Sequence, residues 1–126
     1  MTAMERRAVI LYAHGARDPR WAEPFERLLL RLREKRPQLP AALAFLDYIE
    51  PDLKSSAQAL AAQGITTIRV VPLFFGRGGH LREDFPRQMA AAQVALPQVQ
   101  FEVVEAAGEA PEVLEALADF ALSGLE

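Results

Sequence analysis

Short apolar runs alternate with stretches of helical periodicity along the chain, and this alternation constrains the fold more than any other feature. The strand-like runs cover residues 8–13, 41–46, 66–73 and 99–104. A stretch with apolar residues at helical spacing follows each of them. Strands that alternate with helices predict a parallel sheet, right-handed crossovers and helices on both faces. We therefore expect an α/β fold with a four-stranded parallel sheet.

Proline and apolar spacing locate the expected helices. Proline suits the first turn of a helix because it has no N–H to leave unpaired. The expected helix starts are Asp18-Pro19 or Glu23-Pro24, Pro51, Arg82–Asp84 and Pro111. In the last helix the apolar residues form one stripe, which we expect to be buried. Its members are Val113, Leu114, Leu117, Phe120 and Ala121.

The commonest small arrangement of this kind is flavodoxin-like, and it places the strands at 8–13 and 66–73 side by side at the centre of the sheet. Residues 99–104 alternate apolar and polar, which suits an edge strand. Ligands of such folds bind beyond the carboxyl ends of the strands, where the crossover direction reverses. The reversal lies between the two central strands, so we expect functional side chains in the loops that follow them.

Length and composition narrow the class of protein. The 126 residues fit a single domain spanning 1–126, and 51% hydrophobic with 25% charged residues is a globular composition. No apolar run approaches the roughly 20 residues of a membrane span. The start of the chain lacks a signal-peptide core, so we expect a cytoplasmic protein without a membrane partner. The net charge of −3 argues against a nucleic-acid partner.

Two histidines and no cysteine leave few residues for metal or acid–base chemistry. His14 directly follows the run 8–13, and His80 closes the glycine-rich loop after the run 66–73. In the expected strand order the two histidines lie together at the ligand-binding edge. Neutral imidazoles bind Co²⁺, Ni²⁺, Fe²⁺ or Zn²⁺ and accept protons near neutral pH. We therefore predict catalytic and metal-binding roles for both histidines.

The same loops and the end of the second strand carry further candidates for substrate binding. Arginines beside a cleft in an acidic protein suggest an anionic substrate, and glycines permit close backbone approach or simply a tight turn. A carboxylate there could assist metal capture or proton removal, although Glu50 equally fits a helix N-terminal acid favoured by the dipole. The candidates are Arg17, Asp47, Glu50, Arg77, Gly78 and Gly79.

Three segments occur in a characteristic order: YAHGARDP at 12–19, AFLDYIEP at 44–51, and VPLF at 71–74 followed by GGHLREDFP at 78–86. Together they resemble the short CbiX-type sirohydrochlorin chelatases, which are small class II tetrapyrrole chelatases of cobalamin and sirohaem biosynthesis. The resemblance covers most of the chain. It implies a flavodoxin-like chelatase fold and insertion of Co²⁺ or Fe²⁺, with Ni²⁺ as a further candidate, into sirohydrochlorin.

The resemblance also implies roles for single residues. His14 and His80 correspond to the metal ligands and bases for the pyrrole N–H protons, and Asp47 corresponds to a carboxylate that is usually Glu. Ala16 stands where the family favours Ser. The metal is then a substrate, with no permanently bound cofactor. The chain has no GxxxxGK[ST] loop, so we expect a reaction that does not use ATP. Long members contain two facing domains, so this chain implies a homodimer whose second copy closes the cleft.

Two other functions stay open. A histidine phosphatase forms its intermediate on a histidine after the first strand, but it normally has Arg directly before His-Gly, where this chain has Ala13. A non-catalytic metal or tetrapyrrole binder is favoured by the departures at Ala16 and Asp47. An FMN carrier and a phospho-receiver fit less well, because the loop after residues 8–13 lacks a Ser/Thr-rich phosphate pattern and clustered aspartates.

Overall fold

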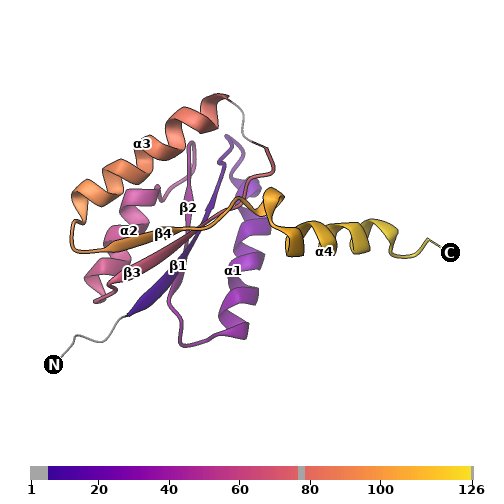
Figure 1. The fold of residues 1–126 in the computed structure, drawn as a ribbon, viewed down its shortest axis with the longest axis horizontal. Helices are drawn as coiled ribbons and strands as arrows, with labels where there is room; N and C mark the ends of the chain where they lie inside the picture. The colour runs from indigo at the N-terminus through magenta and orange to yellow at the C-terminus, as the bar shows by residue number, and fades with distance from the viewer. Residues whose placement is uncertain (1–5, 77–78, 126) are drawn as a thin grey trace.

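A parallel sheet organises the computed structural model, which describes residues 6–76 and 79–125 (Figure 1). The strands are β1 (Arg7–Ala13), β2 (Ala41–Phe45), β3 (Thr67–Pro72) and β4 (Gln100–Val103). Their order is β2-β1-β3-β4, and every neighbouring pair is parallel. This confirms the flavodoxin-like order, with β1 and β3 at the centre and β4 at an edge. Each observed strand lies within one residue of its expected bounds.

Four α-helices and two short 3₁₀ turns connect the described strands and follow β4. They are η1 (Pro19–Ala22), α1 (Glu23–Lys35), α2 (Leu53–Ala62), α3 (Gly79–Ala95), η2 (Ala107–Glu109) and α4 (Pro111–Leu122). Both helix starts expected near the N-terminus are present. Asp18 caps η1, and Pro24 lies in the first turn of α1. Helix α2 begins later than expected, because Asp52 is its N-cap and accepts a hydrogen bond from the Ser55 amide.

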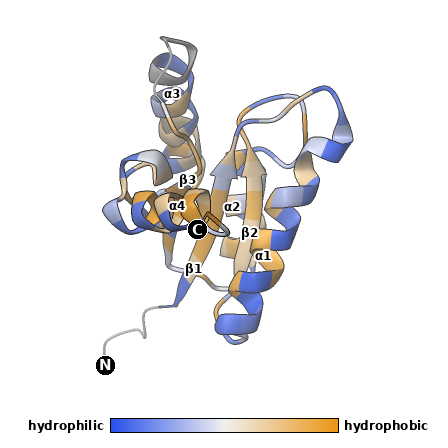
Figure 2. Cartoon of the chain, turned by 90° about the vertical axis from the view of Figure 1, so that its right-hand side faces the viewer, coloured by the Kyte–Doolittle hydropathy of each residue, from blue (hydrophilic) through white to orange (hydrophobic). Residues whose placement is uncertain are grey.

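The sheet separates two layers of helices, with α1 on one face and α2 and α3 on the other (Figures 1 and 2). The larger core lies between the sheet and α2–α3 and contains the fully buried Ile10, Tyr12 and Val70. A smaller cluster around Ala13 and Phe45 lies on the α1 side. No described helix is long and apolar enough to cross a membrane.

Helix α3 begins earlier than the sequence predicted. It starts at Gly79, not near Arg82–Asp84, so His80 is the second residue of a helix and does not close a loop. The first four N–H groups of any helix lack intrahelical partners, so the first turn tolerates a glycine. A glycine at this position therefore resembles a loop glycine in the sequence. The helix then continues through Pro86 to Ala95.

We predicted that the apolar stripe of the last helix is buried, and this prediction is wrong. None of the side chains of α4 is buried, and Phe120 is 78% exposed. The helix leaves the body at Ala110, whose backbone is extended, and projects away from the sheet (Figure 1). Helical periodicity of apolar residues shows that a helix has a face to bury, but it does not show which surface covers that face.

Candidate functional site

His14 lies at the carboxyl end of β1 and is half-buried. Its backbone carbonyl accepts a hydrogen bond of 2.7 Å from the indole Nε1 of Trp21. The centroid of its ring is 4.6 Å from that of Phe74, which follows β3. Trp21 in η1 and Phe74 just after β3 therefore hold His14 at the edge where ligands of this fold bind.

Asp47 holds the backbone next to His14. The carboxylate Oδ1 of Asp47 accepts a hydrogen bond of 2.9 Å from the Gly15 amide. A Cβ atom on Gly15 would lie only 1.7 Å from the Asp47 carbonyl oxygen, so no other residue fits this backbone without a shift. The loops after β1 and β2 are thus pressed together, and the predicted carboxylate is a direct support of the histidine loop.

An aromatic cluster lies beneath the site. The rings of Tyr12, Phe74 and Phe85 pack edge to face, with centroids 5.3 to 6.0 Å apart. The Tyr12 hydroxyl donates to Oε1 of Gln88, whose Nε2 donates to the Leu46 carbonyl at 2.8 Å. Burial, reinforced by Asp47, raises the pKa of the Tyr12 hydroxyl well above its usual range. This chain of contacts joins α3 to the ends of β1 and β2.

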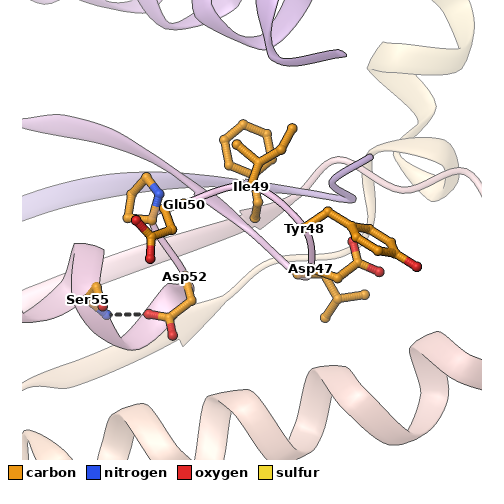
Figure 3. A pocket seen from close by; sticks show the side chains of 9 residues that line it. Asp47, Tyr48, Ile49, Glu50, Asp52 and Ser55 are labelled. Carbon is orange, nitrogen blue, oxygen red and sulfur yellow. Dashed lines mark hydrogen bonds between the residues drawn. The ribbon is translucent and has the colours of Figure 1, made fainter. Parts of the chain in front are cut away.

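The loop between β2 and α2 surrounds a hollow of about 430 Å³ (Figure 3). Asp47, Glu50 and Asp52 line it, together with Tyr48 and Ser55. The Tyr48 backbone is in the left-handed region with φ of 62°, and its side chain is 67% exposed. The guanidinium carbon of Arg17 lies 5.6 Å from the centre of the Tyr48 ring, within the range of a cation–π contact.

The structure brings some predicted site residues together. Asp47 contacts the His14-Gly15 segment, and Arg17 reaches the loop that carries Asp47. Glu50 is exposed and lines the hollow, whereas Asp52 takes the helix-capping role that was the alternative for Glu50. His14 is not one of the residues that line this hollow.

The remaining predictions fall near the start of α3. Gly79 is the first residue of that helix. Arg77, Gly78 and the side chain of His80 lie outside the described part of the chain. Within the described part, no group of three or more His, Asp or Glu residues is arranged to hold a metal ion.

Several residues that shape the site were not predicted from the sequence. Trp21, Phe74 and Gln88 fix His14 and the strand ends, and Tyr48 presents an exposed ring beside Arg17. One signal was available, because Trp21 is the only tryptophan of the chain and follows the His14 motif closely. The other contacts join segments far apart in the sequence, where no local pattern indicates them.

Comparisons with known proteins agree on one family. The CbiX family model matches residues 8–122. A crystal structure of a Marinobacter aquaeolei VT8 protein assigned to cobalamin (vitamin B12) biosynthesis as a CbiX protein is 33% identical, with a TM-score of 0.82, covering 94% of this chain and 97% of that one. The cobalt complex of the sirohydrochlorin chelatase SirB from Bacillus subtilis subspecies spizizenii is 26% identical, with a TM-score of 0.71 over 90% of this chain and 48% of that one.

A curated relative supports the same family. The sirohydrochlorin cobaltochelatase of Sulfurisphaera tokodaii is 31% identical over 81 residues, which are 64% of this chain and 66% of that protein. The matched stretch therefore spans slightly less than two thirds of that relative. Because the family model covers nearly all of the described fold and the Marinobacter protein matches along almost its whole length, the chain belongs to the CbiX family.

Proposed function

We propose that this protein inserts a divalent metal ion, Co²⁺ or Fe²⁺ and as a further candidate Ni²⁺, into sirohydrochlorin without ATP. The observation that carries the proposal is the half-buried His14, held by Trp21 and by the Gly15–Asp47 contact at the carboxyl edge of the central strands. The sirohydrochlorin cobaltochelatase of Sulfurisphaera tokodaii and the cobalt-bound SirB support this choice of substrates.

The chemistry needs a metal ligand and a proton acceptor in one place. Insertion replaces two pyrrole N–H protons with one M²⁺ ion, so the cation must be held near the ring while the two protons leave. Neutral imidazole can do both, since it is a good ligand for these ions and a base near neutral pH. We assign these roles to His14 and His80.

The other site residues have supporting roles in this proposal. Arg17 and Arg77 pair with the carboxylates of sirohydrochlorin, and Gly78 and Gly79 let the backbone approach the macrocycle. Glu50 belongs to the substrate-binding set at the hollow after β2. Asp47 acts chiefly by accepting the Gly15 N–H and thereby placing His14.

A metallation assay tests the proposal. Purified protein is mixed anaerobically with sirohydrochlorin and Co²⁺, Ni²⁺ or Fe²⁺, and the change in the macrocycle's absorption is followed against the rate without protein. His14→Ala and His80→Ala are each expected to lose at least about 100-fold in rate. Gln58→Ala, on the exposed side of α2, is the control and should keep the wild-type rate.

The outcomes separate the open functions. Unchanged rates in both histidine variants would rule out the assigned chemistry. Binding of Co²⁺ or the tetrapyrrole without turnover would identify a non-catalytic binder, and His14-dependent hydrolysis of a generic phosphate ester would identify a phosphatase. The proposal includes a homodimer, whose second copy closes the cleft, and a cytoplasmic location; mass in solution and cell fractionation test these two points.

A further inference from the structure

Tyr48 combines two uncommon features that the proposed function does not use. Its backbone lies in the left-handed region, with φ of 62°, where residues with large side chains are rarely found. Its side chain is 67% exposed, so burial of the ring in the core does not explain this backbone. Such conformations persist only where the surrounding contacts impose them, and they cluster at binding and catalytic sites. Tyr48 is therefore a candidate for a role in the site.

The contacts on either side of Tyr48 impose its conformation. The carboxylate of Asp47 accepts the Gly15 amide at 2.9 Å, and the Asp47 carbonyl accepts the Ile49 amide at 2.7 Å. Ile49 packs against the smaller core cluster on the α1 side. Figure 3 shows the Ile49 side chain and the Tyr48 ring directed to different sides of the loop. The loop thus holds the Tyr48 ring outward, next to the carboxyl end of β2.

The Tyr48 ring packs against Arg17, which lies in the loop after β1. The guanidinium carbon of Arg17 is 5.6 Å from the ring centre, within cation–π range. None of the carboxylates in the described part of the chain forms an ion pair with Arg17. Arg20, in contrast, pairs with Asp18 at 2.7 Å. Arg17 is also exposed, so a ligand can reach its N–H groups while the ring restrains the side chain.

The charges around Tyr48 make a fixed cation useful to an acidic substrate. Asp47, Glu50 and Asp52 line the hollow in the same loop. The Ser55 amide holds the pKa of Asp52 below its ordinary value, so this carboxyl is ionised at neutral pH. A substrate rich in carboxylates would be repelled at this edge of the sheet. A guanidinium offsets that repulsion and pairs with a carboxylate through two parallel hydrogen bonds.

We infer that Tyr48 is a positioning residue for the substrate, whose ring holds the Arg17 guanidinium where it pairs with a peripheral carboxylate of sirohydrochlorin. The inference rests on the proposed function, in which Arg17 binds carboxylates, and goes beyond it by giving Tyr48 and its left-handed backbone a role. An arginine restrained before binding loses less conformational freedom when it pairs. The effect belongs to substrate binding, since His14 is held by other contacts.

Binding of metal-free sirohydrochlorin tests the inference without metal chemistry. The single tryptophan, Trp21, lies at the site, and quenching of its fluorescence reports binding. Tyr48→Asn removes the ring and introduces a residue that adopts the left-handed region more readily. We expect it to weaken binding about 3- to 10-fold, the range of a cation–π contact. Tyr48→Phe keeps the ring and should change binding by less than about twofold.

Variants of Arg17 show whether Tyr48 acts through the guanidinium. Arg17→Ala should weaken binding at least as much as Tyr48→Asn, and combining the two changes should cause no further loss. Arg31→Ala is the matched control and should bind like the wild type, because this exposed arginine of α1 pairs with Glu34 at 3.1 Å. The losses in the Tyr48 and Arg17 variants should shrink at high salt, since exposed ion pairs are screened.

Two further readouts distinguish a positioning role from a structural one. Asn tolerates the left-handed region better than Tyr, so Tyr48→Asn should unfold at a urea concentration no lower than that of the wild type. In the metallation assay its KM for sirohydrochlorin should rise by the same factor as the dissociation constant, with kcat unchanged. A lower urea midpoint together with a lower kcat would show that Tyr48 supports the fold, and would overturn the inference.

Other outcomes also reject it. Unchanged binding in Tyr48→Asn would remove Tyr48 from the site. Losses that multiply in the double variant would show that the ring acts independently of Arg17. A chain that metallates sirohydrochlorin, with unchanged binding in Tyr48→Asn, keeps the proposed function and loses this inference. A chain whose binding depends on Tyr48 and Arg17, but which inserts no metal, does the reverse.

Discussion

Gly15 is the residue at which backbone packing and the candidate site meet. A Cβ there would collide with the Asp47 carbonyl oxygen at 1.7 Å, so Gly15→Ala must displace either the His14 loop or the loop after β2. We expect the free energy of unfolding to fall by about 1–3 kcal/mol, the usual cost of overpacking. Metal insertion should fall as well, because His14 moves with the loop.

A glycine nearby provides the matched control. Gly76 has no heavy atom within 4 Å of an added Cβ and no positive φ. Gly76→Ala should therefore change the free energy of unfolding by less than about 0.5 kcal/mol. Urea unfolding of the two variants measures the contrast, and equal effects would show that the Gly15–Asp47 contact does not constrain the loop.

Tyr12 gives a prediction for alkaline pH. Its pKa is raised in the folded state, so above pH 10.0, the usual value, the unfolded chain loses a proton that the folded chain keeps. The unfolded state then binds fewer protons, and stability falls as pH rises, by up to about 1.4 kcal/mol per pH unit. Below pH 10.0 this contribution to stability is fully present.

The chain has only two tyrosines, which makes the comparison simple. Denaturant unfolding between neutral and alkaline pH should show a shallower loss in Tyr12→Phe than in the wild type. Tyr48→Phe removes the exposed tyrosine and should keep the wild-type slope. A Tyr12→Phe slope equal to that of the wild type would mean that the buried hydroxyl does not cause the alkaline loss.

Single residues also show where sequence reasoning stops. His14 was predicted to lie at the carboxyl edge of a central strand, because an apolar run ends directly before it, and the structure places it there. The contacts that fix it were not predicted. The clash that reserves position 15 for glycine comes from a carbonyl 32 residues away, and Trp21 acts through a backbone atom of His14.

At the scale of elements, the N-cap of α2 decides where that helix begins. Asp52 accepts the Ser55 amide at 2.8 Å, and this bond lowers the pKa of the Asp52 carboxyl. Asp52→Ala is expected to cost about 1 kcal/mol at neutral pH. A lowered folded-state pKa gives stability that is present above the ordinary value of 3.8 and is lost as pH falls through the folded value.

The difference between wild type and Asp52→Ala should therefore shrink in acid. Asp52→Asn keeps an acceptor oxygen without a titrating charge, so its difference from Ala should stay nearly constant over the same pH range. Urea unfolding at neutral pH and below pH 3.8 provides the measurement. A cap contribution from Asp52 that does not change with pH would contradict the role of its charge.

The elements differed in how well they could be predicted. The bounds of β1 followed from a continuous apolar run, since a strand buried on both faces needs one. Those of β4 followed from alternating apolar and polar residues. The start of α3 was misplaced because glycines at 76, 78 and 79 indicate a loop, although Gly79 lies in the first helical turn. Local sequence cannot distinguish a glycine before a helix from one in its first turn, because neither needs an intrahelical N–H bond.

For the whole molecule, α4 shows the limit of reading one chain in isolation. Its stripe correctly predicted an amphipathic helix, but the surface that covers the stripe is not present within the described protomer. Exposed apolar surface of this kind marks an interaction site. In the homodimer of the proposed function, the exposed stripe of α4 is the apolar surface available for contact with the second copy.

The last prediction follows from this incompleteness. If the exposed α4 stripe is buried in the homodimer of the proposed function, folding is coupled to association, and apparent stability depends on protein concentration. Raising the concentration about 100-fold should raise the melting temperature, since each tenfold step adds about 1.4 kcal/mol to a process that converts one dimer into two unfolded chains. Phe120→Glu should melt at a lower temperature that does not vary with concentration, because its α4 stripe no longer docks. Leu122→Glu, which lies off the stripe on the same helix, should keep the wild-type dependence. A wild-type melting temperature independent of concentration would mean that the protomer is stable with α4 unpartnered.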